Sequence, residues 1–149
     1  MDKLSFRDDK IFINKYVVDI KDIEVVELNR GIFGKKTKFY LTINTKLDSI
    51  DCFFSADEFK VLDVFLKLNA VFKKYSFRLV NQKLINKNNL TSIKTDNIDD
   101  GLETLTIYFK DKSYEIYSGY DQNLIDKILI TCNNILDNNK NNNNINELV

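Results

Sequence analysis

The side chains of this chain that could perform chemistry are carboxylates and thiols, because the sequence contains no histidine. Histidine is the commonest general base and the commonest metal ligand, and two cysteines alone cannot complete a four-ligand zinc site. The glycine-rich patterns that cradle phosphate groups are absent as well. The catalytic possibility that remains is a pair of carboxylates working with a bound metal ion.

Two groups of acidic residues were considered for that chemistry. The cluster over 96–101 (Asp-Asn-Ile-Asp-Asp-Gly) lacks the alternating ligand spacing and the distal Glu of a calcium-binding loop, and its residues are typical of turns. Asp51 and Glu115 lie in predicted strands, where the alternation of side chains directs both away from the core. We therefore expect no enzymatic activity, no catalytic residue, no metal and no cofactor. A small metal-assisted carboxylate enzyme is an alternative.

A positively charged segment is the sharpest local feature. No acidic residue occurs between Glu27 and Asp48, and a loop predicted over 29–38 has two apolar residues at its tip. Its candidate binding residues are Arg30, Ile32, Phe33, Lys35, Lys36 and Lys38.

Three interpretations of this loop are open. It could dock on an anionic membrane, where each Lys or Arg contributes about 1 kcal/mol. It could contact a protein, with Phe33 as the anchor. Alternatively, Ile32 and Phe33 fold back onto the core and the lysines only guard an edge strand against unwanted pairing.

The overall charge argues against a nucleic-acid partner. The 22 basic and 22 acidic residues balance, whereas proteins that coat nucleic acid usually carry a clear basic excess. An apolar fraction of 44% with 30% charged residues indicates a globular chain. The absence of proline, the four glycines and the abundance of Lys, Asn and Ile are typical of an AT-rich genome.

The sequence favours a cytoplasmic location. Its first residues are charged and resemble no secretory signal, and no apolar run approaches the ~18 residues of a transmembrane helix. Cys52 and Cys132 lie on apolar faces, and we expect both to be buried free thiols in a reducing compartment. Attachment to the periphery of the membrane is the alternative that the basic loop suggests.

Two stretches of the chain align without a gap at an offset of 64 residues, which predicts an internal repeat. Leu41, Thr42, Ile43, Lys46, Ser49, Asp57 and Asn69 recur as Leu105, Thr106, Ile107, Lys110, Ser113, Asp121 and Asn133. The strands before each hairpin align with a further shift of about three residues. We expect residues 40–72 and 104–136 to take the same shape.

The elements predicted for the first copy are short strands, a hairpin and a helix. Two short strands within 10–20 flank an Asn-Lys turn, a third runs from Ile23 to about Leu28, and a hairpin covers 39–54. A capping box over 55–58 opens a helix that ends near Lys74. Its apolar stripe is widened by Phe59, Leu62 and Leu66, which predicts that the helix is covered on two sides.

The second copy repeats this order with more polar residues. Weak strands within 77–93 precede a hairpin over 102–117, and a final helix begins at Tyr120 or Asp121 and ends near Leu136. We expect an α+β fold of two tandem antiparallel β-meander plus C-terminal helix repeats, packed together. The predicted domains are residues 1–74, residues 75–137 and a disordered Asn-rich tail over 138–149.

The order of strands, hairpin and closing helix resembles the bacterial pleckstrin-homology-like domains over about residues 5–72. The stretch Val18-Asp19-Ile20-Lys21-Asp22-Ile23-Glu24-Val25-Val26 carries this resemblance. The resemblance implies a β-meander scaffold with a binding role. Each repeat is shorter than a full domain of that family, and no position here matches the basic pair that binds phosphoinositide head groups in its lipid-binding members.

The sequence therefore favours a non-enzymatic binding module that contacts another protein through an exposed strand edge or the 29–38 loop. The alternatives are peripheral binding to anionic lipid through the same loop, an immunity-type inhibitor, and the metal-assisted enzyme. The sequence leaves the identity of the partner and the oligomeric state open.

Overall fold

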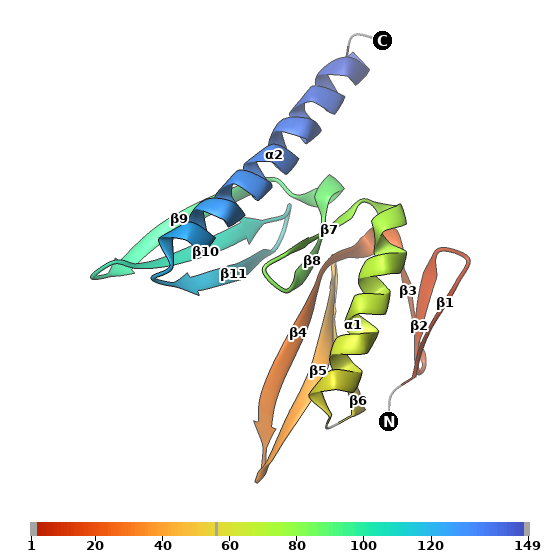
Figure 1. The fold of residues 1–149 in the computed structure, drawn as a ribbon. Coiled ribbons are helices and arrows are strands. Elements are labelled where there is room, and N and C mark those ends of the chain that lie inside the picture. The colour runs from red at the N-terminus through yellow and green to blue at the C-terminus, as the bar shows by residue number, and fades with distance from the viewer. Residues whose placement is uncertain (1–2, 56, 148–149) are drawn as a thin grey trace. The chain divides into compact units, whose positions relative to one another are not determined.

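The computed structural model describes residues 3–55 and 57–147, and its fold is α+β, with antiparallel sheets and two α-helices. The chain divides into two compact units, unit 1 (Met1–Asn86) and unit 2 (Lys87–Val149). Figure 1 shows the elements of both units.

Unit 1 contains two sheets and one α-helix. The smaller sheet has the strand order β1-β2-β3, and the larger has the order β6-β5-β4-β8-β7. The elements are β1 (Leu4–Arg7), β2 (Lys10–Ile13), β3 (Tyr16–Asp19), the 3-10 helix η1 (Ile20–Asp22), β4 (Ile23–Phe33), β5 (Lys36–Thr45), β6 (Ser49–Ser55), α1 (Glu58–Phe72), the 3-10 helix η2 (Lys73–Tyr75), β7 (Phe77–Val80) and β8 (Lys83–Asn86).

The short hairpins of unit 1 turn on residues that tolerate a positive φ. Asn14 between β2 and β3 has φ 52°, and Asn81 and Gln82 between β7 and β8 have φ 45° and 63°. A two-residue turn of this kind matches the right-handed twist of its flanking strands, and Asn adopts it at little cost. The hairpin predicted around the Asn-Lys turn is confirmed, whereas β1 was not predicted.

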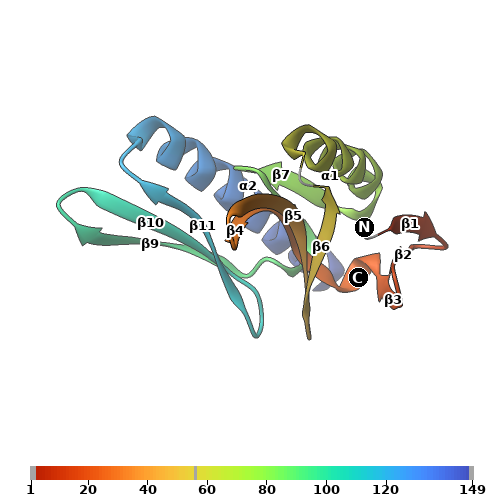
Figure 2. The ribbon, with the colours of Figure 1, turned by 90° about the horizontal axis from the view of Figure 1, so that it is seen from below.

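Helix α1 begins one residue after its cap, Asp57, whose carboxylate accepts a hydrogen bond from the backbone N–H of Phe59 at 2.9 Å. The predicted capping box is therefore wrong in its cap residue, since Ser55 belongs to β6; Ala56 lies outside the described residues. The helix covers one face of the β4–β6 strands (Figure 2). Its buried side chains are Val61, Phe65, Leu68 and Phe72.

The outer face of α1 is not covered by its own unit. Phe59, Leu62 and Leu66 are 78%, 37% and 51% exposed, so the described residues of unit 1 leave this side of the helix open, and its coverage by the second copy stays a prediction.

The β7–β8 hairpin belongs to unit 1 because β8 pairs antiparallel with β4. Val25 lies opposite Ile85 and Val26 opposite Leu84, and all four side chains are fully buried. The division after Asn86 therefore differs from the predicted one after residue 74. The alignment assigned β7 and β8 to the second copy because of their place in the sequence, whereas β8 pairs with β4 of the first copy.

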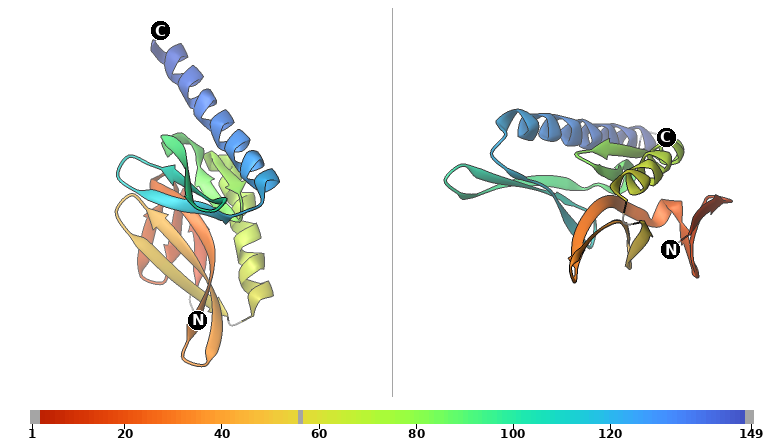
Figure 3. Two further views of the ribbon diagram at one scale, coloured as in Figure 1. Left: turned by 90° about the vertical axis from the view of Figure 1, so that its left-hand side faces the viewer. Right: turned by 60° about the horizontal axis from the view of Figure 1, so that its bottom comes forward.

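Unit 2 has one sheet, in the order β11-β10-β9, with a helix along one face (Figure 3). Its elements are the 3-10 helix η3 (Lys87–Asn89), β9 (Ser92–Asp99), β10 (Leu102–Tyr108), β11 (Ser113–Gly119) and α2 (Gln122–Glu147). The predicted hairpin over 102–117 is confirmed. Asp121 caps α2 by accepting a hydrogen bond from the N–H of Leu124 at 3.2 Å.

Helix α2 continues to Glu147, well past the end predicted near Leu136. The predicted disordered tail over 138–149 is therefore helical as far as Glu147, and residues 148–149 lie outside the described part. An Asn-rich sequence has a low helix propensity but no proline that would stop the helix. Asn139 also donates a hydrogen bond from Nδ2 to the carbonyl of Lys87 at 2.7 Å, which holds this turn against η3.

The elements of the two predicted copies correspond in sequence position. At an offset of 64 residues, β6 coincides with β11 and the first residue of α1 with that of α2. At an offset of 67 residues, β2, β3 and η1 coincide with β7, β8 and η3. This change of offset is the three-residue shift that the alignment predicts.

Candidate functional site

The predicted 29–38 loop is a hairpin. Strand β4 continues to Phe33 and β5 begins at Lys36, so only Gly34 and Lys35 form the turn, with Gly34 at φ 67°. The segment predicted as a loop is therefore mostly strand, and the tight reversal predicted at a glycine occurs at Gly34. The tip of this hairpin lies beyond the end of α1 at the bottom of unit 1 (Figure 1).

The hairpin divides the six candidate residues between two faces. Residues opposite each other in an antiparallel ladder share a face, and Phe33 pairs with Lys36 and Gly31 with Lys38. Lys38 Nζ lies 5.6 Å from the centre of the Phe33 ring. Arg30 and Ile32 occupy the alternate face, and Lys35 lies in the turn.

The two apolar residues of the tip differ in their contacts. Phe33 is 46% exposed, and its ring packs edge to face on Tyr40 at 6.2 Å and Phe53 at 5.5 Å. A Cβ at Gly31 would lie 2.8 Å from this ring, so glycine there permits the contact. Ile32 is 77% exposed. Phe33 thus folds back as one interpretation expected, while Ile32 presents its side chain to solvent.

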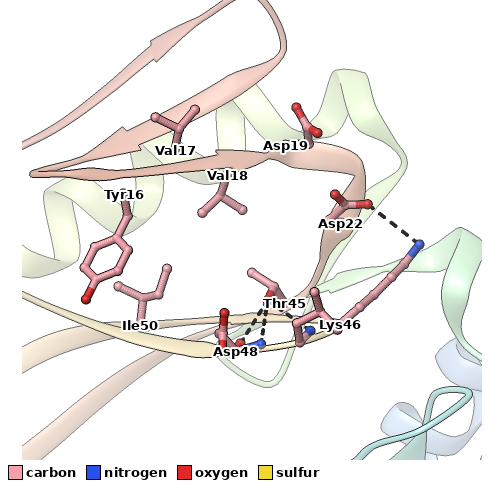
Figure 4. A pocket seen from close by; sticks show the side chains of 10 residues that line it. Tyr16, Val17, Val18, Asp19, Asp22, Thr45, Lys46, Asp48 and Ile50 are labelled. Carbon is pink, nitrogen blue, oxygen red and sulfur yellow. Dashed lines mark hydrogen bonds and ion pairs between the residues drawn. The ribbon is translucent and has the colours of Figure 1, made fainter.

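A cleft that the sequence did not indicate lies between β3 and β6 (Figure 4). Among the strands that the structure describes, β3 is the last strand of its sheet and β6 is the last strand of the other. Each therefore has one edge without a strand partner. The pocket between them has a volume of about 420 Å³ and is lined by 16–19, Asp22, 45–48 and Ile50. We call it the β3–β6 cleft.

The walls of the β3–β6 cleft are mainly apolar. Tyr16 and Val18 point into it from β3, and Ile50 points into it from β6, whereas Val17 points away (Figure 4). Tyr16 is 47% exposed. One end is closed by Lys46, whose N–H donates to the carbonyl of Asp22 at 3.1 Å and whose Nζ lies 3.8 Å from the Asp22 carboxylate.

The charges around the cleft are predominantly negative. Asp19, Asp22 and Asp48 line it together with Lys46. Asp19 is paired at 3.9 Å with Lys10, outside the cleft, and its side chain is 41% exposed. Such exposed ion pairs contribute about 0–1 kcal/mol, so these carboxylates can exchange their partners for a bound cationic group.

The acidic residues proposed from the sequence are not brought together. The described side chains of the 96–101 cluster, including Asp96 and Asp100, are exposed, and the turn itself is Asp100-Gly101. Asp51 and Glu115 are exposed on their strands as expected. Among the side chains that the structure describes, no three of His, Cys, Asp or Glu converge as a metal-binding group. The aspartates of the cleft are thus a source of negative charge rather than a ligand set.

Two cysteines and one tyrosine are the other reactive groups of interest. Cys52 and Cys132 are fully buried and form no disulfide, as the sequence predicted. Tyr75 donates a hydrogen bond from its hydroxyl to Asp9 Oδ1. This hydrogen bond to a carboxylate raises the pKa of Tyr75 above its ordinary value of 10.0, with smaller contributions from desolvation and from the Asp9 charge. The phenol is therefore a poor candidate for a base at neutral pH.

A second pocket, of about 550 Å³, lies in unit 2 between the η3–β9 connection and the C-terminal half of α2. Most of its lining is polar, and Asn89 Nδ2 is buried there without a hydrogen-bond partner among the described residues. It contains no nucleophile paired with a base.

No α-helix in the described part of the chain is both long and apolar enough to cross a membrane. Comparison of the chain with protein-family models, with curated proteins and with solved structures finds no match.

Proposed function

We propose that this chain is a non-enzymatic binding module that takes an extended segment of another protein into the β3–β6 cleft. The observation that supports this proposal best is that two strands without an outer partner line one apolar pocket. An edge strand presents unpaired N–H and C=O groups, and an extended peptide can satisfy them by adding a strand. The volume of about 420 Å³ lies in the range of pockets that bind small ligands and side chains.

The residues that line the cleft indicate which side chains the bound segment should carry. Alternate residues of an added strand point to the same side, so every second side chain would face Tyr16, Val18 and Ile50. Apolar side chains fit these positions. The surplus of aspartates favours a Lys or Arg in the segment, near the end of the cleft closed by Asp22.

The scaffold we propose is a duplicated β-meander plus helix of pleckstrin-homology-like character. The matched offsets of the strands and helices in the two predicted copies support the duplication. The two buried cysteines form no disulfide, which supports a reducing compartment such as the cytoplasm.

We expect replacement of Tyr16 by alanine to weaken peptide binding. The probe is a peptide selected from a random dodecapeptide phage library and measured by fluorescence anisotropy. Because a half-exposed aromatic side chain in a cleft is a typical binding anchor, Tyr16→Ala should raise the dissociation constant about tenfold or more. Selected sequences should alternate apolar residues and include a basic one.

The matched control is Tyr120→Ala, because Tyr120 is 69% exposed and lies in unit 2. It should leave the dissociation constant unchanged. Amide hydrogen exchange should slow in β3 when the peptide is bound. Equal affinity of the two variants, or protection confined to residues 29–38, would show that the cleft is not the binding site.

A second candidate function is peripheral binding to anionic lipid through the tip of the β4–β5 hairpin. The specific observation in its favour is Ile32, which is 77% exposed and accompanied by exposed cations. An apolar side chain can enter the headgroup region while the cations attract anionic lipid.

Reversal of the two turn-proximal charges tests the lipid interaction. In co-sedimentation with phosphatidylserine-containing vesicles at low salt, Lys35→Glu with Lys36→Glu should reduce binding more than ~tenfold, since each cation contributes about 1 kcal/mol. The control is Lys73→Glu with Lys74→Glu, which changes the net charge of unit 1 equally at exposed positions at the other end of α1. If both double variants pellet like the parent protein, or the parent does not pellet, the lipid function is rejected.

A further inference from the structure

The β3–β6 cleft is blocked for a polypeptide chain at one end. There the backbone N–H of Lys46, in the turn between β5 and β6, donates to the carbonyl of Asp22 at 3.1 Å. Asp22 follows β3 at the end of η1, so this hydrogen bond joins the two walls of the cleft directly. A strand lying between the walls would hold them about 9.6 Å apart, which is twice the ordinary strand spacing. A segment added along the cleft therefore has to begin, end or turn outward at this closed end.

The charges at the closed end distinguish the two ends of a polypeptide. Asp48 lines the cleft, and its carboxylate has no hydrogen bond or ion pair among the described residues. The Asp22 carboxylate lies 3.8 Å from Lys46 Nζ, and these two side chains are 42% and 54% exposed. Two carboxylates therefore face one ammonium group at this end. A terminal carboxylate would be repelled there, whereas a terminal α-ammonium group would be attracted.

We propose that the β3–β6 cleft takes the free amino terminus of its partner, with the α-ammonium group at the closed end beside Asp48. This inference rests on the proposed function and names the class of partner, a protein whose chain begins with an exposed, extended segment. A Lys or Arg side chain would also satisfy the charge of Asp48. The chain that carries it would still have to leave the cleft at the hydrogen bond between Lys46 and Asp22, whereas a chain that begins there does not.

An amino terminus at the closed end fixes the direction of the bound segment. In Figure 4, β3 runs from Tyr16 toward the closed end, so a segment that begins there and leaves past Tyr16 is antiparallel to β3. Every second residue of an antiparallel strand bonds to the same neighbour, and the N–H of Ile20 donates to the carbonyl of Asp9 next to β2 at 3.0 Å. The N–H groups of Val17 and Asp19 therefore point to the open edge and would bond the segment.

The test compares several forms of one selected dodecapeptide. Library peptides joined to the phage by their carboxyl ends have free amino termini. The selected peptide is made with a free amino terminus, with an acetylated one, and with Gly-Ser added before its first residue, and each form carries its fluorophore at the carboxyl end. Acetylation removes the charge and the addition displaces it, so both should raise the dissociation constant about tenfold or more. Gly-Ser added at the carboxyl end should leave the dissociation constant unchanged.

A pair of protein variants tests the group that receives the ammonium. In Asp48→Asn, the effect of acetylating the peptide should largely disappear, because the carboxylate that distinguishes the two peptide forms is gone. Asp63→Asn is the matched control, since it removes the same charge from an exposed position of α1 that does not line the cleft. The control should keep the full effect. Both positions are exposed, so both variants should retain the parent circular dichroism spectrum.

The outcomes separate this inference from the proposed function. If Tyr16→Ala weakens binding but acetylation and the amino-terminal addition do not, the cleft binds an internal segment and the amino-terminal assignment is wrong. If Tyr16→Ala has no effect, the proposed function and this inference fall together. Equal effects of acetylation in Asp48→Asn and Asp63→Asn would also overturn the assignment. Amide exchange resolved by residue should slow at Val17 and Asp19 when the free peptide binds.

Discussion

A fragment of residues 1–86 is expected to unfold cooperatively, whereas a fragment of residues 1–74 is expected to have no cooperative transition. The longer fragment keeps the β7–β8 hairpin on the edge of β4. The shorter one exposes that edge and the side chains of Val25 and Val26, which are fully buried in unit 1. An uncovered apolar edge also promotes aggregation.

The destabilisation expected from removing the β7–β8 hairpin is comparable to the total free energy of unfolding of unit 1. The hairpin contributes four apolar side chains that are at most 5% exposed, Phe77, Val80, Leu84 and Ile85. Each contributes about 1.5–3 kcal/mol when buried, against a total of about 5–15 kcal/mol for a typical domain. Asn86, 3% exposed, adds a hydrogen bond from Nδ2 to the carbonyl of Ile23 at 3.0 Å.

Thermal melts followed by circular dichroism, with amide proton dispersion in NMR spectra, distinguish the two fragments. The 1–86 fragment is the matched control, since it differs only by residues 75–86, which are Tyr75 at the end of η2, Ser76 and the β7–β8 hairpin. A 1–74 fragment with the same melting midpoint would place the boundary of the unit where the alignment predicted it.

The second large effect is expected for Phe72→Ala, which should lower the free energy of unfolding by about 3–5 kcal/mol. Phe72 is fully buried at the end of α1. Its ring contacts Phe6 of β1 edge to face at 6.1 Å and Phe77 of β7 at 4.6 Å. Removing it leaves a cavity where three segments distant in sequence meet, and these segments cannot all collapse into it.

Urea denaturation in dilute solution measures the Phe72→Ala effect. Phe59→Ala is the control, because it removes the same side chain from the same helix at a position that is 78% exposed. Its effect should stay within about 0.5 kcal/mol, as is usual for exposed sites. Equal destabilisation by both variants would contradict the assignment of Phe72 to the core.

The candidate site was predicted only in part. The charge pattern identified the hairpin tip from Arg30 to Lys38 because those residues are contiguous in sequence. The charge pattern could not show that β4 continues to Phe33. It also could not show that the Phe33 ring packs on those of Tyr40 and Phe53. The β3–β6 cleft was missed because Tyr16 and Ile50 are far apart in the chain and neither is unusual for a strand. Tyr16-Val17-Val18 gave a weak signal for the cleft, because these three apolar residues lie in a strand too short to bury all of their side chains.

Local sequence patterns alone determined which segments form strands and which form helices. Alternating residues predicted the hairpins over 39–54 and 102–117, the apolar spacing predicted the buried side of α1, and the repeated residues matched β6 with β11. These features depend on neighbours a few positions apart, whose geometry is set by the period of a strand or a helix. Only the tertiary structure decided that β8 pairs with β4 and that β3 and β6 keep an open edge each. Strand pairing across long separations depends on which apolar surfaces can be buried together, and that competition has no signature in the local order of residues.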